Sequence, residues 1–230
     1  MGVTERLNEV EKRICAAAEK SGRRREDITL VAVTKTYPVE MMNEAVDWGV
    51  TDIGENKPQD IRDKFEFVKP VRWHMIGHLQ TNKIKYIIDK VCLIHSVDSI
   101  RLMDEIDKQA LKHGVVMDIL IEINISGEET KSGIAPDELE EMLIHAGELS
   151  NVRVRGLMTV APKNEESVKN VLHFSNMNKI FIDIKGKKYD NVSMDYLSMG
   201  MSNDFETAIE CGSNMVRIGS AIFGKRNYDI

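Results

Sequence analysis

The sequence predicts an α/β protein: a (β/α)8 TIM barrel with one extra helix at its amino terminus. Short apolar, β-branched segments of strand length alternate along the chain with periodic segments of helix length. Eight such pairs fit into 230 residues, the usual size of one barrel. Strands alternating with helices imply right-handed crossovers and a parallel sheet. We therefore expect one domain over residues 1–230, and the competing fold is a doubly wound open sheet.

The first half of the chain supplies the extra helix and four units. Apolar residues recur at helical spacing from Leu7 to Ala18, after a cap at Thr4 and before a stop at Gly22. The expected strands cover residues 28–34, 51–54, 71–76 and 91–95. The expected helices cover residues 38–48, 57–67, 82–89 and 99–113.

The second half continues the alternation without a break. Its expected strands cover residues 116–125, 152–158, 194–198 and 215–218. Its expected helices cover residues 137–149, 165–184 and 204–211, with a short last one near Ala221. No low-complexity linker or repeat divides the sequence, which agrees with a single domain.

Composition excludes several classes of protein. A net charge of −6 gives no general attraction to nucleic acid. No apolar run has the length of a signal peptide core or a membrane span, so we expect a cytoplasmic protein. Three widely spaced cysteines form neither a disulfide framework nor a zinc motif. His74 and His78 flank a strand end and a glycine, so we expect structural histidines and no metal.

Lys35 stands directly after the first expected strand, where a cation does not belong to a core. Ligands of parallel α/β folds bind beyond the carboxyl ends of the strands, so this amine is a candidate reactive group, although most lysines at strand ends are simply solvated. The same rim should carry Asn56 after the second strand. Met158 and Met199, after the sixth and seventh strands, are candidates to line a ring pocket there.

The loops after the seventh and eighth strands have the small and hydroxyl-bearing residues of a phosphate seat. Ser202 and the pair Gly219 and Ser220 lie where barrels often bind phosphate, although each could be only a cap or turn residue. Arg217 shares a strand face with Gly219 and could donate to a pyridine nitrogen, or else form an ion pair. A lysine facing a phosphate seat favours a Schiff base with pyridoxal 5'-phosphate (PLP). A Schiff-base aldolase acting on a sugar phosphate is a further reading.

Six segments resemble the pyridoxal phosphate homeostasis protein family. They are residues 31–35, 53–56, 73–83, 156–159, 198–202 and 217–224, in order over nearly the whole chain. The resemblance implies a barrel similar to the amino-terminal domain of alanine racemase and of eukaryotic-type ornithine decarboxylase. It places a Schiff base on Lys35, the phosphate around Ser202, Gly219 and Ser220, Arg217 near the pyridine nitrogen and Asn56 near the ring. The family's usual Glu-Asn-Arg-Val-Gln run is Glu-Asn-Lys-Pro-Gln at residues 55–59.

The resemblance implies a protein that buffers, stores or delivers PLP inside the cell. The alternative is a PLP-dependent amino-acid racemase or decarboxylase, which needs a second acid-base group that two-domain relatives obtain from an additional β domain. The chain ends at Ile230, about where the barrel closes, so we expect no such domain and no established turnover. The expected partners are PLP and the PLP-dependent apo-enzymes that would receive it, and the expected state is a monomer.

Overall fold

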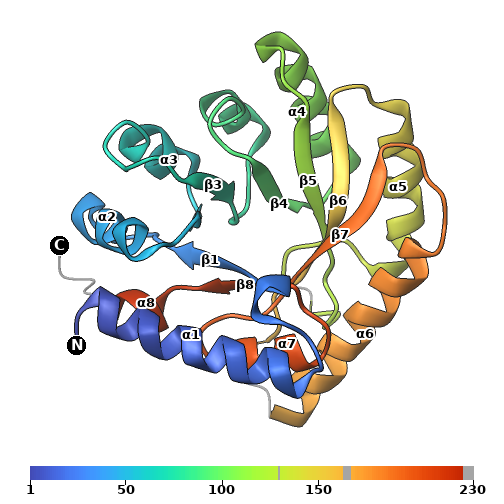
Figure 1. Ribbon diagram of the computed structural model, residues 1–230. Coiled ribbons are helices and arrows are strands. Elements are labelled where there is room, and N and C mark those ends of the chain that lie inside the picture. The colour runs from blue at the N-terminus through green and yellow to red at the C-terminus, as the bar shows by residue number, and fades with distance from the viewer. Residues whose placement is uncertain (129, 163–166, 225–230) are drawn as a thin grey trace.

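Eight parallel strands form a closed barrel in the computed structural model (Figure 1). In chain order the strands are β1 (Thr29–Val33), β2 (Asp52–Glu55), β3 (Arg72–Met75), β4 (Leu93–Val97), β5 (Met117–Glu122), β6 (Val152–Met158), β7 (Val192–Ser198) and β8 (Met215–Ile218). Each strand pairs with the next, and β8 returns to β1 with Val31 opposite Arg217. The predicted barrel is therefore confirmed, and the open sheet was the wrong alternative. The structure describes residues 1–128, 130–162 and 167–224.

Helices connect the strands and cover the outside of the barrel. They are α1 (Val3–Lys20), α2 (Val39–Trp48), α3 (Pro58–Lys64), α4 (Ile100–His113), α5 (Leu139–Glu148), α6 (Ser167–Lys185), α7 (Phe205–Glu210) and α8 (Ser220–Phe223). The helix expected over residues 82–89 is instead the 3₁₀ helix η2 (Thr81–Tyr86). Residues 165 and 166 of the helix expected over 165–184 lie outside the described residues.

The extra amino-terminal helix α1 lies along the outside of the barrel beside α8 and α7 (Figure 1). Its apolar face is buried, with Leu7 and Ile14 fully enclosed. On its other side Arg13 forms an ion pair with Glu206 of α7 at 2.6 Å. The helix begins at Val3 with Gly2 in the cap position, two residues before the cap expected at Thr4. Helix α1 thus packs against α7 and α8, the helices that follow β7 and β8.

Strand alternation separates two apolar clusters. The outer cluster lies between strands and helices and includes Ile53 and Phe205, both fully buried. The inner cluster fills the barrel and contains Val31, Leu93, Leu120, Met158 and Met215. Polar side chains share the interior with that small inner cluster, since Asp52, His74, His95, Ser198 and Arg217 are all buried as well. The barrel interior thus contains a row of buried polar side chains that includes Arg217, one of the predicted site residues.

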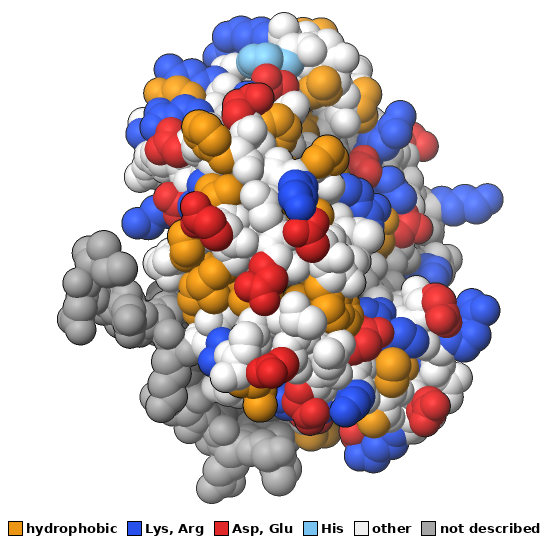
Figure 2. All heavy atoms as spheres, turned by 60° about the vertical axis from the view of Figure 1, so that its left-hand side comes forward, with side chains coloured by type: hydrophobic (Ala, Val, Ile, Leu, Met, Phe, Trp, Pro, Cys, Tyr) orange, Lys and Arg blue, Asp and Glu red, His pale blue; other side chains and the backbone are white. Residues whose placement is uncertain are grey.

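None of the described helices has both the length and the apolar character that crossing a bilayer requires. Acidic and basic side chains are interspersed on the face drawn in Figure 2, with no broad area of one sign.

Candidate functional site

Lys35 lies at the carboxyl end of β1, in the turn that leads to α2. Its side chain is half-buried, and the next residue, Thr36, has a φ of +71° that non-glycine residues seldom adopt. Before it, Thr34 is fully buried and its hydroxyl donates to Oε1 of Glu55 at 2.9 Å. We call this end of the barrel, where the strands reach their carboxyl ends, the mouth.

Ser202 joins the loop after β7 to the start of α8. Its hydroxyl oxygen accepts hydrogen bonds from the backbone N–H groups of Gly219, at 3.2 Å, and of Ala221, at 3.3 Å. A Cβ atom at Gly219 would lie 3.2 Å from both the backbone oxygen and Cβ of Val33, so the chain passes close to β1 here. Ser220 is exposed at the first position of α8. The predicted phosphate-seat residues are therefore brought together beside the strand that carries Lys35.

Gly200 gives the loop after β7 its shape. Its φ is +95°, and a Cβ atom there would lie 2.6 Å from Cβ of Ala208 on α7. Its carbonyl accepts the backbone N–H of Arg217 at 3.0 Å, which ties the loop to β8. A side chain at position 200 would displace the loop that carries Ser202.

Arg217 points into the barrel just below the mouth. It is 3% exposed, and its guanidinium donates from Nη1 to Ser198 Oγ at 2.5 Å and from Nη2 to the carbonyl of Thr159 at 2.8 Å. Burial lowers its pKa to about 10, although the charges of Glu122 and Asp204 oppose that shift. The Arg217 side chain is thus buried inside the barrel and held there by two hydrogen bonds.

Glu122 is a titratable group of the mouth that sequence reasoning missed. It ends β5 opposite Met158 in the register and is 6% exposed. Burial, reinforced by the charge of Asp98, raises its pKa to about 7 against the opposing effect of Arg217. The signal available in the sequence was an acidic residue near the carboxyl end of the longest expected strand, next to the mouth. The site therefore holds a carboxyl group that titrates near neutral pH beside a guanidinium.

Two buried acceptors at the end of β2 lack hydrogen-bond partners among the described residues. They are Oδ1 of Asn56 and Oε2 of Glu55. The other oxygen of Glu55 accepts from Lys64 at 2.8 Å, and burial still raises the pKa of this carboxyl. The backbone of Asn56 is crowded by Gly77, where a Cβ atom would lie 2.5 Å from its carbonyl oxygen. An unpartnered buried acceptor beside the mouth fits a bound molecule that brings its own donor.

Only one of the two predicted methionines faces the interior. Met158 belongs to the inner cluster and is next to Ser198 in the register of β6 and β7. Met199 belongs to the outer cluster, because it follows the inward Ser198 and strand alternation turns it toward the helices. The expectation that Met199 lines a ring pocket is therefore corrected: its buried side chain packs outside the barrel.

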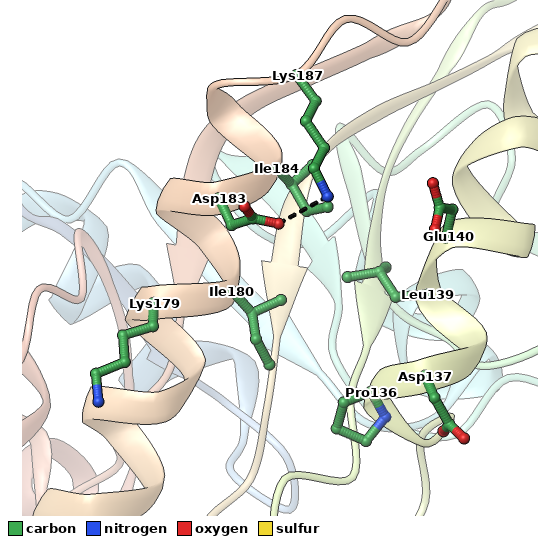
Figure 3. A pocket seen from close by; sticks show the side chains of 9 residues that line it. All are labelled: Pro136, Asp137, Leu139, Glu140, Lys179, Ile180, Asp183, Ile184 and Lys187. Carbon is green, nitrogen blue, oxygen red and sulfur yellow. Dashed lines mark ion pairs between the residues drawn. The ribbon is translucent and has the colours of Figure 1, made fainter.

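A further hollow of the described surface lies away from the mouth. A groove of about 400 Å³ runs between the start of α5 and the far half of α6, with Leu139, Ile180 and Ile184 on its floor and charged side chains at its edges (Figure 3). The ion pair of Asp183 with Lys187 spans part of one edge at 2.8 Å. This groove contains none of the predicted site residues. Nor do the described residues contain a cluster of three or more side chains suited to a metal.

Comparison with known proteins gives the same picture as the geometry. The family described as alanine racemase, N-terminal domain, matches residues 7–227. The curated pyridoxal phosphate homeostasis protein of Aquifex aeolicus is 44% identical over 232 residues, covering 99% of this chain and 100% of that protein. A solved structure described as an unknown protein from Bifidobacterium adolescentis has a TM-score of 0.91 at 35% identity, with 96% and 94% coverage. PipY of Synechococcus elongatus with PLP bound has a TM-score of 0.83 at 26% identity, with 96% and 100% coverage.

These matches extend over nearly the full length of both partners, and they confirm the resemblance inferred from the six sequence segments. The chain therefore belongs to the alanine racemase N-terminal domain family and, within it, to the pyridoxal phosphate homeostasis proteins.

Proposed function

We propose that this chain binds PLP through Lys35 and acts in PLP homeostasis by buffering, storing or delivering the cofactor. The observation that carries the proposal is the placement of a half-buried lysine beside the Ser202 and Gly219 loops, with Arg217 directed into the barrel below them. A PLP-bound relative of the same fold supports it. PLP supplies an aldehyde that an amine can capture, a phosphate, and a pyridine nitrogen.

The residues of the mouth fit such a ligand. The hydroxyl of Ser202 and the amide of Ser220 are small donors on adjoining loops, as a phosphate requires, and Gly219 lets the backbone pass close to β1 between them. Arg217 keeps N–H groups beyond the two bonded to Ser198 and Thr159, and a guanidinium beside a pyridine nitrogen would hold that nitrogen unprotonated. Asn56 has a buried oxygen ready to accept from the ring substituents. Met158 offers an apolar inner wall.

Reduction and peptide mapping test the covalent part. Purified protein should show a visible absorbance band, and borohydride should fix the adduct on Lys35. The variant Lys35→Ala should lose both the band and the adduct. Lys57→Ala is a matched control, because Lys57 is an exposed lysine at the start of α3 and close in sequence to Asn56. An adduct found only on a lysine other than Lys35 would contradict the assignment.

The homeostasis role is favoured over the racemase or decarboxylase alternative by the relatives, since the protein of Aquifex aeolicus that the chain matches end to end carries that name. We expect amino-acid racemization and decarboxylation to stay at the level of a PLP-only blank. Sustained turnover that disappears in Lys35→Ala would reverse the choice between the two functions.

The wider setting belongs to the same proposal. We propose a cytoplasmic monomer whose partners, besides PLP, are PLP-dependent apo-enzymes. Sedimentation of the holoprotein tests the oligomeric state. Transfer of PLP to an apo-enzyme, measured as recovered activity in the presence of a competing PLP trap, tests the delivery role: recovery no faster than that given by free PLP would contradict it.

A further inference from the structure

A continuous row of polar side chains crosses the interior of the barrel from Arg217 at the mouth to Asp52 at the opposite end, which we call the base. Nη1 of Arg217 lies 2.5 Å from Oγ of Ser198, and that oxygen lies 3.1 Å from Nδ1 of His95. Nε2 of His95 lies 2.9 Å from Nδ1 of His74, and Nε2 of His74 lies 2.8 Å from Oδ1 of Asp52. All five side chains are 3% exposed or less.

Asp52 fixes the direction of the bonds at the base. Burial alone would raise the pKa of this carboxyl, but hydrogen bonds from His74, Arg72 and Thr51 outweigh burial and lower the pKa to about 2. An ionised carboxylate can only accept, so Nε2 of His74 carries a proton and donates to Asp52. Arg72 holds the second carboxylate oxygen at 2.7 Å.

Arg217 fixes the direction at the mouth. A guanidinium can only donate, so the hydroxyl oxygen of Ser198 accepts from it. Burial, together with the charge of Arg217, lowers the pKa of His95 well below its usual value, so His95 is neutral and carries one N–H.

One arrangement then satisfies every polar atom between the two ends. Ser198 donates its hydroxyl to Nδ1 of His95, His95 donates from Nε2 to Nδ1 of His74, and His74 donates from Nε2 to Asp52. The reverse arrangement needs a second proton on His74 and makes Ser198 accept from both neighbours. The Ser198 hydroxyl has no third acceptor among the described residues, so the reverse arrangement would bury an unused donor.

We propose that Ser198, His95, His74 and Asp52 are positioning residues for Arg217, joined in a hydrogen-bonded column whose donors all point from the mouth to the base. The column holds the guanidinium in one orientation and thereby sets which N–H groups face the ligand side. Because each histidine in this arrangement donates from Nε2 and accepts at Nδ1, a change in hydrogen bonding at the base also changes the hydrogen bonding of Arg217. Its consequence for the cofactor rests on the function proposed above.

The base of the column borders a small pocket. A small pocket of about 100 Å³ is lined there by Asp52, Arg72, His74 and Cys92, together with Asp118. Other titratable groups surround the column. At the base Cys92 lies 3.5 Å from Nε2 of His74, and Arg72 and Asp118 face Asp52 and Cys92. At the mouth the charges of Glu122 and Asp204 act on Arg217.

The direction of the column can be tested in cofactor-free protein, independently of PLP. Nitrogen-15 NMR of the histidine rings at pH 7 should show His74 and His95 both neutral, both protonated at Nε2, with a strongly deshielded Nε2 proton on His74. Protonation of either ring at Nδ1, or a doubly protonated ring, would overturn the proposed direction.

The coupling can be tested with two matched variants at the base. Asp52→Asn removes the charge that anchors the column, whereas Asp118→Asn makes the same change in a carboxylate that pairs with Arg155 at 2.6 Å and forms no bond to a histidine. We expect Asp52→Asn to move the ring nitrogen signals of both His74 and His95 and to weaken PLP binding several-fold, with a shift in the absorbance spectrum of the bound cofactor. Asp118→Asn should change neither.

The possible outcomes distinguish a failure of the proposed coupling along the column from a failure of the proposed PLP-binding function. Unchanged His95 signals and unchanged PLP affinity in folded Asp52→Asn would overturn the coupling, as would equal effects of both variants. Failure of the unaltered protein to take up PLP would overturn the proposed function instead, and the NMR measurement on cofactor-free protein would still decide the direction of the column.

Discussion

Replacing Glu122 by glutamine should make the cofactor-free protein more stable, with a gain that grows as pH rises from about 4.5 to 7 and stays constant above that. In the folded protein the pKa of this carboxyl is raised from 4.5 to about 7, mainly by burial. The folded chain therefore holds a proton that the unfolded chain releases between roughly pH 4.5 and 7. The free energy of unfolding falls as pH rises through that window. A difference of roughly 2.5 pKa units corresponds to about 3 kcal/mol at pH 8, as an upper bound.

Glutamine has the shape of the protonated carboxyl and no charge, so Glu122→Gln should equal the unaltered protein at pH 4.5 and exceed it by up to about 3 kcal/mol at pH 8. Urea unfolding curves at the two pH values, analysed as a difference between variant and parent, measure this directly. Glu141→Gln is a suitable control, because Glu141 is exposed on α5 and such surface exchanges stay within about 0.5 kcal/mol. A variant that gains no stability between pH 4.5 and 8 would refute the assignment.

Three further predictions concern stability. Ser202→Ala leaves the amides of Gly219 and Ala221 without their acceptor, so unfolding should become easier by about 1 kcal/mol in urea titrations. Gly200→Ala places a Cβ in an occupied space at a positive φ and should cost more than about 1 kcal/mol, whereas a cost near zero would show that the loop can move freely. Asp52→Asn should cost about 2 kcal/mol at pH 7, since the pKa of Asp52 is lowered from 3.8 to about 2. That loss should vanish as pH falls through 4 to 2, and a loss unchanged at pH 2 would contradict it.

The fold could be predicted because alternation and length are local properties. The strands at residues 152–158 and 215–218 have the predicted bounds, and β4 is displaced by only two residues from 91–95 to 93–97. The helix expected over 82–89 forms only the 3₁₀ turns of η2, because a short segment between two strands can satisfy its backbone with tighter turns. Local patterns set the order of elements better than their ends.

The site could be predicted only in part, because the spatial order of the strands depends on pairing between segments that are far apart in the sequence. Lys35, Ser202, Gly219 and Arg217 could be proposed from their places at strand ends. The hydrogen-bonded column could not be predicted, because its members come from four different strands. They meet only in the closed sheet, where the strand register sets the position of each side chain along the barrel axis.

Met199 shows the same limit on a smaller scale. It is one residue from the inward-facing Ser198, yet it packs outside, because neighbouring side chains at a strand end point to opposite faces. The sequence placed both residues at the same mouth. The pairing of β7 with β6 and β8 determines which side chains of β7 point inward. Ser198 therefore faces the interior and Met199 faces the helices.

The pairing of β1 with β8 has a consequence for the order of events during synthesis. Strand β1, which leads to Lys35, is made early, but one of its two neighbours is formed by residues 215–218. Until those residues leave the ribosome, one edge of β1 is unpaired and both Arg217 and Gly219 are missing. A nascent chain stalled before residue 215 therefore carries the lysine without the groups that would retain the cofactor. Uptake of PLP should consequently report a finished barrel, and truncated chains should not deplete the cofactor pool.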